Sequence, residues 1–161
     1  MKISVITVTK NNKNGLIGAI ESVKNQSYQN IEHVIVDGNS TDGTLEILRQ
    51  AISGKNLSNN LSLITNHYSL ITISEEDNGI YDAINKGIAL STGDVIGFLH
   101  SDDLFYNGTV LESIMEKMEK EKTDSVYGDL VLTMGAGDIG RLAAQLPKLF
   151  QANGGGHASF E

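Results

Sequence analysis

An apolar run that ends in two adjacent carboxylates constrains this chain more than any other feature. Residues 95–99 read Val-Ile-Gly-Phe-Leu, and Asp102 and Asp103 follow shortly after. Such a run is typical of a strand buried on both faces, as in a parallel sheet. In open α/β sheets, ligands bind at the carboxyl ends of the strands. The pair therefore indicates either a site for a cation or a hydroxyl-rich ligand, or a strand end whose Asp caps the next turn.

The rest of the chain alternates between strand-like and helix-like patterns. β-Branched runs predict strands over residues 2–9, 31–37, 70–75, 95–100 and 125–132. Helical spacing of apolar residues predicts helices over 16–25, 44–53, 80–90 and 108–122, with a surface loop over 54–66. The alternation predicts βαβ units, and hence an α/β fold with a mostly parallel sheet flanked by helices on both faces.

The character of the sequence changes after Thr133. Two glycine-rich stretches follow, at 134–138 and 153–156, with a short helix expected over 141–151 between them. We expect a folded core over residues 1–132 and a separate glycine-rich segment over 133–161. Because the pattern stops in the middle of an element, we expect this segment to be the start of an incomplete portion.

Composition excludes several classes of function. The formal net charge of −8, with no dense cluster of Lys or Arg, argues against a nucleic-acid partner. Cysteine is absent, which rules out disulfides and thiolate chemistry. No apolar run reaches the roughly 18 residues of a membrane span, so we expect a cytoplasmic protein. With only Arg49 and Arg141 as arginines, the chain would need a divalent metal to hold a phosphate ester.

Polar side chains are predicted at three strand ends on one edge of the sheet. They are Thr7 and Thr9, Asp37, and the pair Asp102 and Asp103. Taken singly, Asp37 could form an Asx turn into the glycine that follows, and the threonines could be ordinary strand residues. Because parallel strands end side by side, the groups together predict one polar cleft.

Six motifs, in order along the chain, resemble the family 2 glycosyltransferases of the GT-A (Rossmann-like) fold. They lie at residues 3–12, 22–28, 36–44, 77–87, 91–94 and 98–103, and include Asp37-Gly-Asn-Ser-Thr-Asp-Gly-Thr44 and Asp77-Asn-Gly-Ile-Tyr-Asp-Ala-Ile-Asn-Lys-Gly87. The resemblance covers residues 2 to about 132 and implies that this part is a core that binds a nucleotide sugar.

The resemblance also implies roles for particular residues. Thr7, Thr9 and Asp37 match positions that line the nucleoside pocket, with Asp37 a candidate to hydrogen-bond the base. Asp77 and Asn85 match a segment that runs under the nucleotide and helps to place the ribose or the sugar.

The segment Ser101-Asp102-Asp103 resembles the DXD-type motif of the family. The resemblance implies that Asp103 binds Mg²⁺ or Mn²⁺ and that Asp102 faces hydroxyls of the ribose or sugar. His157 is either a further metal or diphosphate ligand or incidental. Lys10 stands where the family usually has an aromatic residue, and Lys86 is expected on a solvated helix face.

The resemblance implies an inverting transferase that moves a sugar from a nucleoside-diphosphate donor, expected to be UDP-linked, to a saccharide or lipid-linked acceptor. In the family, the segment with the catalytic base normally follows a stretch that residues 157–160 resemble. This sequence ends before such a segment would appear, so we assign no catalytic residue. Polysaccharide or glycoconjugate synthesis and a place in the cytoplasm, peripheral to the inner face of the membrane, are the expected setting. Two alternatives are a non-catalytic or truncated module that only binds the nucleotide sugar and, ranked last, a nucleotidyltransferase.

Overall fold

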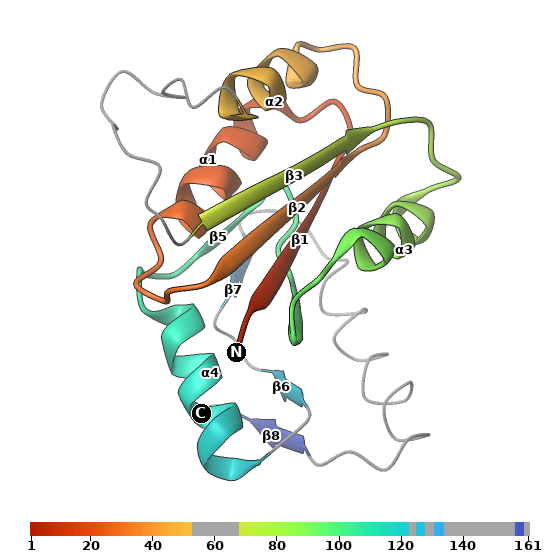
Figure 1. Ribbon diagram of the computed structural model, residues 1–161. Helices are drawn as coiled ribbons and strands as arrows, with labels where there is room; N and C mark the ends of the chain where they lie inside the picture. The colour runs from red at the N-terminus through yellow and green to blue at the C-terminus, as the bar shows by residue number, and fades with distance from the viewer. Residues whose placement is uncertain (53–67, 123–124, 128–130, 134–156, 160–161) are drawn as a thin grey trace.

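The computed structural model describes residues 1–52, 68–122, 125–127, 131–133 and 157–159, and these carry the whole description (Figure 1). Their elements, in chain order, are β1 (Ile3–Thr9), α1 (Lys13–Lys24), β2 (Ile31–Asp37), α2 (Thr44–Ile52), β3 (Tyr68–Ser74), α3 (Ile80–Leu90), β4 (Val95–Phe98), β5 (Asp103–Phe105), α4 (Val110–Glu121), β6 (Ser125–Tyr127), β7 (Val131–Thr133) and β8 (His157–Ser159). None of the described helices is both long and apolar enough to cross a membrane.

The core is a four-stranded parallel sheet in the order β3-β2-β1-β4. Every residue of β1 and β2 is buried, which agrees with their continuous apolar and β-branched sequences. The prediction of a mostly parallel α/β sheet with helices on both faces is confirmed. Figure 1 shows α1 and α2 on one side of the sheet and α3 on the other.

Two apolar clusters attach the helices to the two faces. On one face, Ile35 of β2 packs with Leu16 and Ile20 of α1 and with Ile47 and Leu48 of α2. Burying a side chain of this size stabilises a fold by about 1.5–3 kcal/mol. Neighbouring residues of a strand point to opposite faces, so the residues on either side of Ile35 serve the other helix layer.

The second face is covered by α3. Val34 and Val36 of β2 and Ile6 of β1 pack there with Ala83 and Ile84. The two clusters lie on opposite faces, so helices pack against the sheet from both sides.

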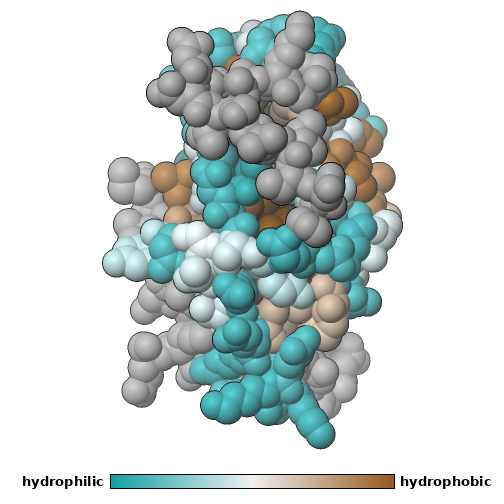
Figure 2. Space-filling view, turned by 60° about the vertical axis from the view of Figure 1, so that its left-hand side comes forward, coloured by the Kyte–Doolittle hydropathy of each residue, from teal (hydrophilic) through white to brown (hydrophobic). Residues whose placement is uncertain are grey.

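Helix α4 completes the first layer near the amino ends of the strands. Its buried residues Leu111 and Met115 pack in a cluster with Ile3 and Val5 of β1. Its exposed positions are mainly charged, and Figure 2 shows hydrophilic side chains over the lower part of the face where α4 lies. This is the amphipathic pattern that predicted the helix.

Helix α1 begins three residues earlier than predicted, because Asn12 caps it. The Asn12 side chain accepts a hydrogen bond from the Gly15 N–H at 3.2 Å, so the polar residues Lys13 and Asn14 form the first turn. Apolar periodicity cannot detect a polar first turn. The other predicted helices differ from α2, α3 and α4 by no more than two residues at either end.

The predicted strand over 125–132 is wrong as a fifth member of the sheet. The described residues there form two short strands, β6, which pairs with β8, and β7, which pairs antiparallel with β5. Strands β5 and β8 were not predicted, because three-residue strands exist only through pairing with distant segments. The predicted loop at 54–66 and helix at 141–151 lie outside the described residues.

A buried carboxylate fixes the amino ends of β1 and β2 to the turn before β4. Glu32 Oε1 lies 2.5 Å from Lys2 Nζ and accepts from the Thr92 hydroxyl at 2.6 Å. Glu32 Oε2 accepts from the Ser4 hydroxyl at 2.7 Å and the Thr92 N–H at 2.8 Å. Burial alone would raise the pKa of Glu32, but these hydrogen bonds lower it to about 2.

We expect Glu32→Gln to lower the free energy of unfolding by about 2 kcal/mol at neutral pH. The substitution replaces one carboxylate oxygen by an NH₂ group, which cannot accept the hydrogen bonds that the surrounding N–H and O–H groups donate. The folded pKa of about 2 lies below the ordinary value of 4.5, so the unfolded state binds more protons between them and this stabilisation is lost as the pH falls from 4.5 toward 2. Urea unfolding of both proteins across this range checks the difference, which should shrink with acid.

Glu46→Gln is the matched control, because Glu46 is exposed and lies 3.8 Å from the exposed Arg49. Its effect should stay under about 0.5 kcal/mol. Equal losses in the two variants would contradict a structural role for Glu32.

Candidate functional site

The sheet register brings the carboxyl ends of three strands level with one another. Thr9 of β1 pairs with Asp37 of β2, and Asp37 pairs with Ser74 of β3. We call the segments that follow the strands, residues 10–12, 38–43, 75–79 and 99–103, the carboxyl-edge loops. The predicted convergence therefore holds for Thr9 and Asp37, and Ser74 of β3 joins them although it was not predicted. The Asp102 and Asp103 pair follows β4, which pairs with β1 only over Ile3–Ile6.

Asp37 is the centre of this edge. It is fully buried, and its Oδ2 accepts hydrogen bonds from the Ser40 N–H at 3.1 Å and the Ser74 hydroxyl at 2.7 Å. Its Oδ1 accepts from the Ser40 hydroxyl, which in turn accepts from the Asn11 N–H at 2.7 Å. Asp37 thus joins β2, β3 and two carboxyl-edge loops. Its contact with a nucleotide base remains a prediction, and in this structure its carboxylate is engaged with protein groups.

Further hydrogen bonds hold the loops after β1 and β2 together. Asn11 Oδ1 accepts from the Thr41 N–H at 2.8 Å, and Asp42 Oδ2 accepts from the Lys13 N–H at 3.0 Å. Asp42 Oδ1 accepts from the Thr44 N–H at 3.0 Å, as expected for a residue that caps the helix beginning there. The hydrogen bond from the Thr44 side chain, followed by the one from the Lys13 backbone, lowers the pKa of Asp42.

Asp77 lies directly against the turn that follows Asp37. A Cβ atom at Gly38 would overlap the Asp77 carboxylate. The Asp77 side chain is 8% exposed, and its Oδ1 accepts from the Gly79 N–H at 3.0 Å and lies 4.0 Å from Lys10 Nζ. The structure therefore brings Asp77 and Asp37 together, with the glycine between them allowing the close approach.

The two threonines of β1 have different environments. The Thr7 hydroxyl lies 2.8 Å from His33 Nε2, and His33 Nδ1 lies 2.8 Å from the Tyr68 hydroxyl. Burial lowers the pKa of His33 to about 3, so the ring is neutral. Thr7 is fully buried in this sheet network, and its place in a nucleoside pocket remains a prediction. Thr9, at the strand end, has a buried hydroxyl with no hydrogen-bond partner.

Asp103 is the buried member of the carboxylate pair. It is 1% exposed, and its Oδ2 has no hydrogen-bond partner. Burial, reinforced by the negative charge of Asp102, raises its pKa to about 6, against a backbone hydrogen bond at His100 that lowers it. Asp102 is exposed. Asn12 Nδ2, at the start of α1, donates to the Ser101 hydroxyl at 3.1 Å and so ties this loop to the helix.

Among residues 1–52 and 68–122, the buried side-chain atoms that lack a partner are Thr9 Oγ1 and Asp103 Oδ2. Both residues were predicted as site residues from the sequence. A buried polar atom without a partner is rare in folded proteins and calls for an explanation, such as a missing ligand or ion. The two orphaned atoms are the strongest structural sign that this edge binds something.

The residues present suit a hard divalent cation that a ligand helps to hold. Carboxylate oxygens are the donors that Mg²⁺ and Mn²⁺ prefer, and Mg²⁺ is usually held by one or two carboxylates together with phosphates. In the part of the chain with described side chains, no group of three or more His, Cys, Asp and Glu residues could hold a metal without such help. Asp103, with its orphaned oxygen, fits this kind of site.

The remaining predicted site residues are less informative. Asn85 is exposed on α3. His157 lies in β8, where it pairs with Ser125, and its side chain lies outside the described atoms. Sequence reasoning missed the roles of Ser40 and Ser74 as partners of Asp37. Ser74 could have been found, because it ends the strand next to Asp37.

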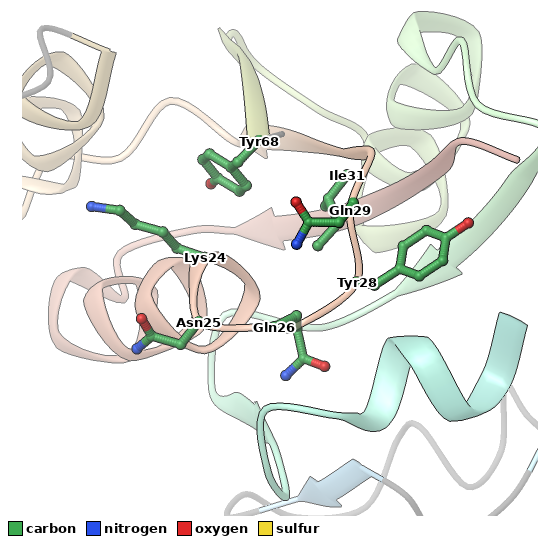
Figure 3. Close-up of a pocket in the computed structure, with 7 residues that line it drawn as sticks. All are labelled: Lys24, Asn25, Gln26, Tyr28, Gln29, Ile31 and Tyr68. Carbon is green, nitrogen blue, oxygen red and sulfur yellow. The ribbon is translucent and has the colours of Figure 1, made fainter. Parts of the chain in front are cut away.

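A hollow at the opposite end of the sheet holds none of the predicted site residues. Figure 3 shows it between the end of α1 and the first residues of β2 and β3. Its volume is about 150 Å³. Its lining residues are mostly polar: Lys24, Asn25, Gln26, Tyr28, Gln29, Ile31 and Tyr68.

Comparison with known proteins gives consistent matches. The family model "Glycosyl transferase family 2" matches residues 4–155. The "PGL/p-HBAD biosynthesis glycosyltransferase" of Mycobacterium bovis (strain BCG / Pasteur 1173P2) is 35% identical over 146 residues, covering 86% of this chain and 53% of the relative. The chain therefore spans about half the length of such curated relatives.

Two solved structures show the same fold. S. aureus TarS 1-349 in complex with UDP-GlcNAc has a TM-score of 0.69 and 23% identity, covering 85% of this chain and 36% of that one. The mannosyltransferase PcManGT from Pyrobaculum calidifontis, in complex with GDP-Man and Mn²⁺, has a TM-score of 0.65 and 22% identity, covering 78% of this chain and 34% of that one. The chain has the GT-A fold that the resemblance implied.

We expect Asp103→Asn to stabilise the protein by about 1–3 kcal/mol at about pH 7.5, because each unit of raised pKa corresponds to about 1.4 kcal/mol. The native state binds more protons than the unfolded state between pH 3.8 and about 6. The ionised Asp103 carboxylate therefore lowers the free energy of unfolding by its full amount above this range, and this destabilisation disappears as the pH falls through the range. Urea unfolding at several pH values measures the difference, with Asp102→Asn as a comparison expected to stabilise less. A loss of stability in Asp103→Asn would contradict an unpartnered carboxylate.

We expect Gly38→Ala to lower the free energy of unfolding by about 1–3 kcal/mol, because the new methyl group displaces the Asp77 carboxylate. In an Asp77→Ala background the same change should cost clearly less, because the overlapping atoms are gone. Denaturant unfolding of the wild type, the two single variants and the double variant gives the coupling free energy between Gly38 and Asp77. Equal costs in both backgrounds would show that the two residues do not touch.

Proposed function

This chain belongs to glycosyl transferase family 2, and we propose that it is the donor-binding part of an inverting glycosyltransferase. The donor is a nucleoside-diphosphate sugar, and a UDP-linked sugar is the first choice. The related fold of TarS, solved with UDP-GlcNAc, supports this choice, and that of PcManGT, solved with GDP-Man, makes a guanosine donor the natural comparison.

One observation carries the proposal: the orphaned oxygen of the buried Asp103 at the carboxyl edge. Burying a carboxylate without a partner lowers the stability of a fold, and a bound cation would supply the missing partner. Asp103 would hold Mg²⁺ or Mn²⁺, and Asp102 would face hydroxyls of the ribose or sugar. When bound, the metal would neutralise charge on the leaving diphosphate.

The protein's own residues would bind and orient the donor. Thr9 offers an orphaned hydroxyl beside the strand ends, and Asp77 lies over the turn after Asp37. Asp37 keeps the carboxyl-edge loops in place and is the proposed partner of the base, while Asn85 on α3 is a further donor contact. Thr7 contributes through its bond to His33 beneath the site.

The acceptor side of the reaction belongs to the proposal as well. The acceptor would be a hydroxyl of a saccharide or of a lipid-linked glycan, in polysaccharide or glycoconjugate synthesis. Such an acceptor suits a cytoplasmic enzyme peripheral to the inner face of the membrane. No residue is assigned as the base that removes the acceptor's proton.

Calorimetry with UDP tests the metal site and the donor class together. We expect Mn²⁺ to tighten UDP binding by about tenfold or more, which corresponds to about 1.4 kcal/mol. Asp103→Asn should lose this gain, because an amide holds a divalent cation far less well than a carboxylate. The same titration with GDP ranks the two nucleotides.

Glu116→Gln is the control, because it removes one exposed negative charge on α4 and leaves the carboxyl-edge loops unchanged. It should keep the full effect of Mn²⁺. The metal assignment would be refuted if Mn²⁺ did not change the affinity for UDP, or if Mn²⁺ still tightened UDP binding in Asp103→Asn. Slow metal-dependent hydrolysis of a nucleotide sugar by this chain would count against a module that only binds its donor.

A further inference from the structure

Lys86 lies half-buried on α3, next to the exposed Asn85. Its side chain is 23% exposed, and its ammonium group has three contacts. Nζ lies 2.9 Å from Glu75 Oε1 and 3.3 Å from Asp82 Oδ2, and it donates to the Glu76 carbonyl oxygen at 2.6 Å. An ammonium group has three N–H donors, so these contacts use its full capacity.

The partners of Lys86 lie on both sides of Asp77 along the chain. Glu75 and Glu76 come just before it. Asp82, which Lys86 also contacts, accepts a hydrogen bond from the Asn78 N–H at 3.0 Å just after it. Lys86 therefore contacts the start of the segment that carries Asp77 directly and reaches its end through Asp82.

The segment would repel itself without this cation. Glu75, Glu76, Asp77 and Asp82 all carry carboxylates within residues 75–82. Like charges so close together disfavour a compact loop, and an exposed single ion pair would do little to oppose them. The Lys86 ammonium, in contact with two carboxylates and a main-chain carbonyl, opposes the repulsion at one point.

Residues 75–79 lie at the carboxyl edge. The Glu75 N–H donates to the Asp37 carbonyl at 3.0 Å, and the Asp77 carboxylate lies against Gly38. Any shift of residues 75–79 would move Asp77 away from the turn that Asp37 organises.

We propose that Lys86 is a positioning residue of the donor site, which holds Asp77 against Gly38 by fixing residues 75–79 to α3. The proposal rests on the proposed function, because it takes the carboxyl edge as the place where the nucleotide binds. Lys86 itself touches no donor atom in this scheme. Its effect on the donor passes through Asp77.

The test is a double-mutant cycle in the full chain, with the dissociation constant for UDP in the presence of Mn²⁺ as the readout. Lys86→Met keeps most of the length of the side chain and removes the charge, and we expect it to weaken UDP binding about five- to tenfold. Lys86→Arg should recover most of the affinity, because the cation is restored. In an Asp77→Ala background, Lys86→Met should change the affinity by less than about twofold.

Lys117→Met is the matched control. Lys117 also forms an ion pair one helical turn along, with Glu121 at 3.9 Å, but on α4. It should leave UDP affinity unchanged. Amide hydrogen exchange gives a second readout without any ligand. The Asn78 and Gly79 amides should exchange faster in Lys86→Met and remain as in the wild type in Lys117→Met.

The outcomes separate the two proposals. If the wild type binds UDP and Lys86→Met binds it within about twofold, the positioning role is overturned while the proposed function stands. If Lys86→Met weakens binding equally with and without Asp77, the role through Asp77 is also overturned. If the wild type binds neither UDP nor GDP, the proposed function fails first and the role of Lys86 at a donor site fails with it.

Discussion

The pairing of β1 with β2 is the constraint on which the rest of the structure depends. Seven consecutive residues pair in parallel, from Ile3 with Ile31 to Thr9 with Asp37, and every one of them is buried. Since the two strands end level, the loops that follow them must leave the sheet at the same height. β3 continues the same register from β2, and β4 pairs with the first half of β1. The site is thus a consequence of where the strands stop.

The buried carboxylates at the two ends of this sheet differ in hydrogen bonding and in the direction of their pKa shifts. At the amino end, both oxygens of Glu32 accept hydrogen bonds, and its pKa falls to about 2. At the carboxyl end, Asp103 keeps an oxygen without a partner, and burial raises its pKa to about 6. The first arrangement stabilises the ionised form and the fold. The second costs stability at neutral pH, which is common where a protein keeps a group free for a ligand.

Asp37 and Asp77 show how the neighbouring loops support that free group. Asp37 accepts three hydrogen bonds from Ser40 and Ser74, so it also fixes the turn around Gly38. Asp77 is placed against that turn by a segment held to α3 through Lys86. The carboxyl edge therefore combines rigid supports with two orphaned polar atoms, those of Thr9 and Asp103.

The sequence by itself determined the parallel α/β core, the extents of most helices and the edge at which the polar residues gather. It could do so because buried parallel strands and amphipathic helices have distinct apolar patterns that depend on local sequence. It also singled out Thr9 and Asp103, each of which has a buried oxygen without a hydrogen-bond partner in the structure, and their roles remain predictions. Only the tertiary structure decided that β6 and β7 lie outside the sheet, that Thr7 bonds His33 and that Lys86 contacts Glu75. These depend on contacts between residues distant in the chain, and a pattern along the sequence does not record which of two neighbours a side chain will reach.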